Sequence, residues 1–377
     1  MGKVNAKKII LIVVSIIAII LAIICIKTII NNITINKQMK SAKHAITLTN
    51  NVELYSSTKT KKSINTLAQG TNTYILESDT DKAGNKLYKV KAGKQVGYVQ
   101  ADKIGYYTQS KMKKVRMVDV SQFNMQNNFT SIEHFKAFLI NNNIQYVYVR
   151  AGGRGYGQAG NFYYDTNYKD YAEACEYLKI PFGFYFLDEA ITSEEVNEEV
   201  EFIDEFLKEN NYHYNKLPVA LDVEKHIEKG RADEIWDTRY NLVNELITKL
   251  NKKDIKSILY SNASIANEYL TNVNSKMWLA YYPNISEEPS YWFSSTDAEG
   301  ASNKELISKM VAWQFSDKGI PNTISEKVDI SIVYNEFFTS GTTNEMKSDL
   351  LGTNYKALKV IELKNKRKIV DVFTIGR

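Results

Sequence analysis

The chain contains little cysteine, histidine or proline: 2, 4 and 5 residues out of 377. Cys25 lies in an apolar run and Cys175 in a segment predicted to be helical, so we expect no disulfide between them. The four histidines are scattered, and no Cys/His spacing is typical of a metal site. The sequence therefore predicts no disulfide framework and no metal, and we expect no cofactor.

Most of the chain also lacks a basic surface. Residues 1–40 contain six lysines and no acidic residue, and residues 41–108 contain ten lysines and five acidic residues. Because the net charge of the whole chain is +5, the remaining 269 residues carry −6. That sign disfavours nucleic acid as a partner. The charge of residues 41–108 suits an anionic polymer such as the cell wall, or simply a solvated face rich in lysine.

One long stretch near the N-terminus has no charged residue. It runs from Ile9 to Ile26, and as a helix its eighteen residues would span about 27 Å, close to the hydrocarbon thickness of a bilayer. We interpret residues 9–30 as a membrane anchor; a cleaved or lipidated signal segment and a buried soluble helix are the alternatives. Lysines at 3, 7 and 8 favour a cytoplasmic tail of residues 1–8 and a C-terminal part outside the cell, facing the wall.

Residues 31–108 change character twice. Residues 31–44 are polar and basic and are interpreted as a stalk. Short alternating segments at 72–76, 87–91 and 96–99, separated by turn residues, predict a small all-β barrel over 45–108. Its Val52–Ser56, Leu87–Val90 and Gly97–Val99 stretches resemble a bacterial SH3-like domain. The resemblance implies contact with wall peptides, and a spacer role is the competing interpretation.

From residue 115 apolar strands alternate with helical patterns. Strands are predicted at 116–120, 145–150, 182–186, 219–223, 257–261, 277–281, 310–315 and 327–330, and helices at 131–139, 168–178, 193–208, 233–250 and 263–270. Eight strands, mostly separated by helices, indicate an α/β fold, an irregular β/α barrel.

The most informative segment is Leu217–Lys225, an apolar run that ends in two acids. Side chains alternate along a strand, so Asp222 and Glu224 project to the same side. Burial and a neighbouring like charge both raise a carboxyl pKa, so one of the pair should hold its proton near neutral pH. A glycosidase needs one protonated and one ionised carboxyl group. The alternative is a pair of structural acids that are hydrogen-bonded or solvated.

Further polar and aromatic residues occur at the ends of other strands. Asp119 lies in the first strand and Asp329 in the eighth, which a closed barrel places side by side, so four acids could converge at one mouth. The same level of other strands contains residues suited to sugar faces and hydroxyls: Tyr185, Tyr260, Tyr281, Trp313 and Gln314. Any one tyrosine could equally serve packing.

Over residues 115–338 the chain resembles glycoside hydrolase family 25, the Chalaropsis-type lysozymes. The resemblance is carried by Val118–Ser121, Tyr148–Gly152, Gly183–Tyr185, Leu217–Glu224, Trp278–Tyr281, Trp313–Phe315 and Val328–Asp329. It implies cleavage of the β-1,4 bond between N-acetylmuramic acid and N-acetylglucosamine in peptidoglycan.

The resemblance also implies roles for single residues. Glu224 would be the general acid, Asp222 would stabilise the acetamido group or the ionic intermediate, and Asp119 and Asp329 would hold substrate. Arg150 would contact substrate together with the aromatic residues and Gln314. Where the family often has histidine, glutamine and asparagine, this chain has Phe186, Asn124 and Ser331, which we expect to alter subsites.

Three classes of function compete. The first is an anchored muramidase that remodels the wall locally. The second is a non-catalytic or weakly catalytic wall-binding component of an envelope-spanning secretion or conjugation apparatus. The third is a glycosidase for another β-linked amino sugar polymer such as chitin. The extension at 339–377 has no assigned role.

Overall fold

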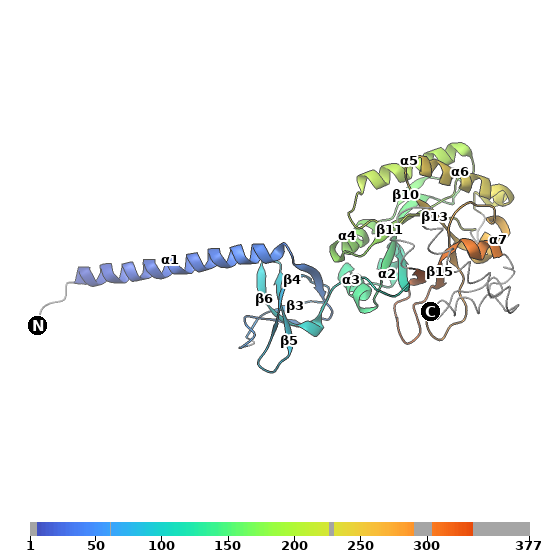
Figure 1. Cartoon of the computed structure of the whole chain (residues 1–377). Helices are drawn as coiled ribbons and strands as arrows, with labels where there is room; N and C mark the ends of the chain where they lie inside the picture. The colour runs from blue at the N-terminus through green and yellow to red at the C-terminus, as the bar shows by residue number, and fades with distance from the viewer. Residues whose placement is uncertain (1–5, 61, 226–229, 290–303, 335–377) are drawn as a thin grey trace, which may run out of the picture. The chain divides into compact units, whose positions relative to one another are not determined.

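The computed structural model describes residues 6–60, 62–225, 230–289 and 304–334, and the chain divides into two compact units, residues 1–106 and 107–377 (Figure 1). The C-terminal extension at 339–377 lies outside the described residues. Each unit is described by itself.

The first unit begins with a long helix, α1 (Ala6–Met39). By length and composition its Val13–Met39 part could cross a membrane, since an 18-residue window within it has a mean hydropathy of 3.0, and an N-terminal signal sequence has the same features. The helix continues through residues 31–39, so most of the predicted stalk is helical.

Seven strands follow α1 and form one antiparallel sheet in the order β3-β2-β6-β5-β4-β1-β7. They are β1 (Lys43–Thr47), β2 (Val52–Tyr55), β3 (Ser63–Leu67), β4 (Asn72–Thr80), β5 (Lys86–Ala92), β6 (Gln95–Gln100) and β7 (Ile104–Gly105), with a short 3-10 turn η1 (Ala101–Lys103) before the last. The strands predicted at 72–76, 87–91 and 96–99 are confirmed. Leu54, Val90 and Val99 are fully buried in the apolar cluster of this sheet.

The second unit is built on a closed eight-stranded barrel, because β8 pairs with both β16 and β9. Its strands are β8 (Lys114–Val120), β9 (Tyr146–Arg154), β11 (Phe182–Leu187), β12 (Val219–Asp222), β13 (Ser257–Asn262), β14 (Met277–Ala280), β15 (Met310–Ser316) and β16 (Asp329–Tyr334), and a short strand β10 (Phe162–Tyr164) is added on β9. All eight predicted strands are confirmed, with β16 beginning two residues later than expected.

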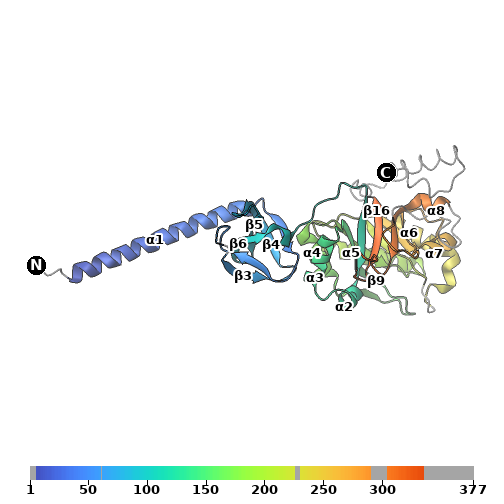
Figure 2. The same cartoon turned by 90° about the horizontal axis from the view of Figure 1, so that it is seen from below.

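Helices surround the barrel strands (Figure 2). They are α2 (Gln122–Asn127), α3 (Ile132–Asn141), α4 (Tyr168–Leu178), α5 (Ser193–Glu209), α6 (Arg239–Lys252), α7 (Ala263–Tyr269) and α8 (Lys304–Lys309), with a 3-10 helix η2 (Asp233–Thr238) before α6. In Figure 2 strands β9 and β16 lie between α3 and α4 on one side and α6, α7 and α8 on the other. The predicted helices are confirmed, except that 233–250 divides into η2 and α6.

The last strand runs against the others. β16 is antiparallel to β15 and to β8, whereas the pairs from β8 and β9 through β14 and β15 are parallel. No helix lies between β15 and β16, so the chain returns in the opposite direction. The first residue of β16, Asp329, therefore lies at the mouth where the other strands end, directly opposite Asp119.

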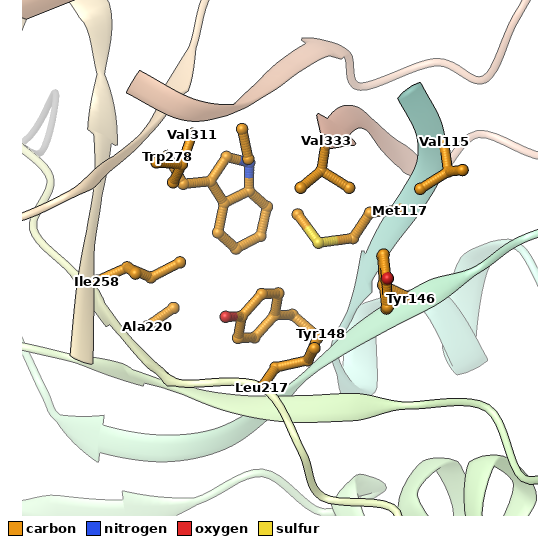
Figure 3. Close-up of a cluster of buried hydrophobic side chains, with 11 residues drawn as sticks. Val115, Met117, Tyr146, Tyr148, Leu217, Ala220, Ile258, Trp278, Val311 and Val333 are labelled. Carbon is orange, nitrogen blue, oxygen red and sulfur yellow. The ribbon is translucent and has the colours of Figure 1, made fainter. Parts of the chain in front are cut away.

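Aromatic and aliphatic side chains fill the barrel interior. Tyr148 and Trp278 point toward each other across it and stack with ring centroids 5.0 Å apart (Figure 3). Tyr148 needs the space left by Gly183, because a Cβ there would lie 2.8 Å from its ring. Because side chains fill the interior, the barrel is not an open channel. Functional residues are therefore expected at its mouth.

Candidate active site

On each barrel strand, the polar or aromatic residue at the mouth occupies the next inward-facing position after the core residue. Met117, Tyr148, Ala220, Ile258 and Ala312 belong to the core cluster, and two residues further along each strand come Asp119, Arg150, Asp222, Tyr260 and Gln314. Alternation along the strands therefore places these five side chains on the interior side of the same end of the barrel.

Gln314 connects three of the strands at this level. Its Nε2 donates to Asp119 Oδ1 at 2.9 Å, and its Oε1 accepts from Tyr260 Oη at 2.8 Å and from Tyr282 Oη at 2.5 Å. Because Gln314 is only 1% exposed, its amide orientation is fixed by these partners. The network holds one carboxylate oxygen of Asp119 toward β15.

The four predicted acids influence one another electrostatically. Burial and the charge of Glu224 raise the pKa of Asp222 well above its ordinary value, with Asp119 adding to the effect and Arg150 opposing it. Burial and Asp329 do the same to the pKa of Asp119. Burial, Asp317 and Glu224 raise the pKa of Asp329 to about 7. Glu224 itself is half-buried just after β12.

We expect Asp329→Asn to change how stability depends on pH. The folded protein keeps the Asp329 proton up to about pH 7, whereas the unfolded chain releases it near 3.8, so this group makes the protein less stable as pH rises between these values. Asparagine cannot ionise, so the loss of unfolding free energy between pH 4 and pH 8 should shrink by about 2–4 kcal/mol. Denaturant titrations at both pH values measure it, with the exposed Asp237→Asn as control. An unchanged pH dependence would contradict the raised pKa.

Arg150 is positioned by a buried carboxylate that sequence reasoning missed. Its Nε donates to Asp165 Oδ2 at 2.9 Å, and Asp165 also accepts from the Gln122 backbone. The side chain of Asp165 is fully buried just after the short strand β10, for which the glycine-containing segment before it gives no alternating pattern. Arg150 favours the ionised form of Asp222, against the acids around it.

Several tyrosines interact with the acids. Burial raises the pKa of Tyr185 well above its ordinary value, and the charges of Asp119, Asp222 and Asp329 add to the shift. Tyr282 was not predicted, yet its hydroxyl reaches Gln314 and its pKa is raised, chiefly by burial and then by Asp329. Burial also raises the pKa of Tyr163 of β10, with the charge of Arg150 opposing and that of Asp222 adding to the shift.

Trp313 and Tyr281 do not join this layer. Each is one residue away from an inward-facing position, and the two pair with each other: Trp313 Nε1 donates to the Tyr281 backbone oxygen at 2.8 Å. Trp313 is 2% exposed, so its ring is buried in the fold. The binding roles of Trp313 and Tyr281 stay predictions, and it is Tyr282 whose hydroxyl contacts Gln314.

The three departures from the family pattern have structural roles. Ser331 is fully buried in the barrel and accepts from Trp278 Nε1 at 2.9 Å. Asn124 closes a capping box with Ser121 at the start of α2. Phe186 packs its ring on Phe206 of α5, outside the barrel. None of the three side chains lies in the layer of acids. Their positions therefore do not support the expectation that they alter the sugar-binding subsites.

No group of three or more His, Cys, Asp or Glu side chains among the described residues is arranged to hold a metal ion. The described mouth offers carboxyl groups with raised pKa values, an arginine and several tyrosines. Such a set can donate a proton, stabilise a positive charge and bind hydroxyl groups.

A family model, glycosyl hydrolases family 25, matches residues 118–324. No curated protein matches the chain. Among solved structures, the spore cortex lytic enzyme SleM of Clostridium perfringens shares 19% identity, with 60% of this chain and 69% of that one covered and a TM-score of 0.44. The modular autolysin LytC of Streptococcus pneumoniae shares 18%, covering 73% and 62%, with a TM-score of 0.43.

The bacterial lysozyme of Streptomyces coelicolor shares 17% identity, with 65% of this chain and all of that one covered and a TM-score of 0.40. With identities below 20% and TM-scores below 0.5, these structural likenesses add no weight to the family match.

Proposed function

The chain belongs to glycosyl hydrolases family 25, and from this premise we propose that it is a membrane-anchored muramidase. Its substrate would be peptidoglycan, cut at the β-1,4 bond between N-acetylmuramic acid and N-acetylglucosamine during local remodelling of the wall. The observation that carries the proposal is the convergence of Asp119, Asp222 and Asp329, all influenced by Glu224, at one barrel mouth. Membership of a hydrolase family favours an enzyme over a non-catalytic scaffold.

Within this proposal each acid has a role. Glu224, half-buried and next to Asp222, would protonate the leaving oxygen of the glycosidic bond. Asp222 would stabilise the positive charge that develops on the sugar. Asp119, held by Gln314, and Asp329 would bind substrate and favour the protonated form of their neighbours.

The remaining polar groups of the mouth would bind the glycan. Arg150, held by Asp165, would contact its polar groups, and Tyr185, Tyr260 and Tyr282 would offer rings and hydroxyls to the sugars. No cofactor enters the proposal.

The reaction products test this function directly. The full chain in detergent micelles is incubated with purified peptidoglycan, and the soluble fragments are reduced and analysed by mass spectrometry. New reducing-end muramic acid supports a muramidase, whereas reducing-end glucosamine or cleavage of chitin oligomers alone would point to a different specificity. Absence of any released fragment across pH 4–8 would overturn the proposal.

We assign α1 to the membrane and the all-β unit to the wall. The apolar part of α1 supports an anchor, and the net charge of +5 over residues 41–108 supports contact with an anionic polymer or wall peptides. An SH3-like role for residues 45–108 and a cytoplasmic N-terminus belong to this assignment.

Protease treatment of intact cells should degrade the barrel and leave a short N-terminal fragment in the membrane. A chain lacking residues 2–40 should leave the membrane fraction altogether. A cytoplasmic protein followed in the same samples controls for lysis. A barrel that resists protease until the cells are broken would contradict an external location.

A further inference from the structure

A single buried arginine holds the loop that follows β11. Arg239, the first residue of α6, is 1% exposed. One of its terminal nitrogens donates to the Asp188 backbone oxygen at 2.7 Å and to Asp188 Oδ1 at 2.8 Å, and the other donates to the Ala190 backbone oxygen. The planar guanidinium thus fixes both ends of the turn 188–190, which a lysine could not do with one ammonium group.

Glu199 of α5 holds the middle of the same turn. Its Oε1 accepts from the Glu189 backbone nitrogen at 3.3 Å and from Arg154 Nε at 3.0 Å. Burial and the neighbouring Asp188 raise the pKa of Glu199 well above its usual range, while Arg239 and Arg154 oppose the shift. Two helices, α5 and α6, are therefore tied to three consecutive residues.

The turn 188–190 also contacts the end of β12, the strand that leads into the acidic pair Asp222 and Glu224. The Asp188 backbone nitrogen donates to the Asp222 backbone oxygen at 2.9 Å, and Leu187 is paired with Asp222 in the parallel ladder. Beyond Asp222, the Val223 nitrogen donates to the Tyr260 backbone oxygen on the other side. Residues 222 and 223 are thus fixed on both sides, by the turn and by β13.

We propose that Asp188, Glu199 and Arg239 form a clamp that positions Asp222 and Glu224 for the reaction. All three are positioning residues, since they act through the backbone of the turn and of β12. The kinetic consequence rests on the muramidase function proposed above.

The alternative is that the clamp merely stabilises the fold. A buried ion pair is weak evidence for that, because exchange for apolar side chains of similar size is often neutral for stability. Catalysis is more sensitive than stability to the positions of these groups, since a misplacement of a reacting group by about 1 Å can lower the rate about a hundredfold. A variant that keeps the fold but loses the directed hydrogen bonds separates the two roles.

The experiment compares the full-length wild type in detergent with the double variant Asp188→Leu/Arg239→Met. We expect kcat on peptidoglycan to fall about 10- to 100-fold, with KM changed less than about threefold and the melting temperature within a few degrees. The matched control is Glu245→Leu/Lys249→Met, which removes a 2.5 Å ion pair from the outer part of the same helix. Its kcat should equal that of wild type.

Amide hydrogen exchange gives a second reading that needs no turnover. Protection of the amide at position 188 should fall in the double variant while the barrel strands keep theirs. Wild-type kcat in a folded double variant, or a loss of kcat that only follows a loss of thermal stability, would overturn the clamp. An inactive wild type would contradict the proposed function but not the clamp. In that case the change in amide exchange at position 188 would still test whether the clamp holds the turn.

Discussion

Glu224→Gln should lower kcat on peptidoglycan by about a thousandfold or more, because a positioned general acid contributes about 10²- to 10⁴-fold. Glutamine has nearly the shape of glutamic acid but cannot give a proton to the leaving oxygen. Since Glu224 is half-buried and its charge raises the pKa values of Asp119, Asp222 and Asp329, the neutral variant should be at least as stable as wild type. Release of reducing-end muramic acid measures the turnover.

The matched control for this variant is Glu209→Gln, which makes the same chemical change at an exposed position at the end of α5. It should keep wild-type kcat. Sedimentation with insoluble peptidoglycan should show equal binding by wild type and both variants. An active Glu224→Gln enzyme would remove Glu224 from the acid role and send the search for the proton donor to Asp222, Asp119 and Asp329.

Much of this site follows from the two-residue period of a strand. Asp222 lies two residues after Ala220, and Asp119 two after Met117, so a correct strand prediction is enough to place both at the mouth. Asp329 was predicted at the mouth although its strand is antiparallel. It lies there because it begins β16, and pairing in register with Asp119 places it among the acids.

The same period separates neighbouring residues of one strand. Trp313 and Tyr281 were predicted at the mouth together with Gln314, but each is one residue out of phase with the interior positions, and the contacts at the mouth are made by Gln314 and Tyr282. Asp165 contacts Arg150, 15 positions away, and Arg239 contacts Asp188, 51 positions away. No local sequence pattern predicts such contacts. Only the folded chain brings them to Arg150 and Asp188.

The second large effect is expected from Asp222. Asp222→Asn should lower kcat by about 100- to 1000-fold, the range found when one group that stabilises developing charge is removed. Asp222 is 9% exposed, and among the described residues its Oδ1 has no hydrogen-bond partner. A buried carboxylate oxygen is costly to leave without a partner, which favours a functional over a purely structural role for Asp222.

Stability and activity should move in opposite directions in this variant. Burial, Glu224 and Asp119 all disfavour the charged form of Asp222, so the neutral asparagine should raise the melting temperature at neutral pH while it removes activity. Calorimetry and muropeptide release on the same preparation measure both, with the exposed Asp237→Asn as control for each. A variant that loses activity and stability together would show that Asp222 serves the fold. One that keeps its activity would show that the charge on Asp222 is not used, and the pair would return to its alternative interpretation as two structural acids.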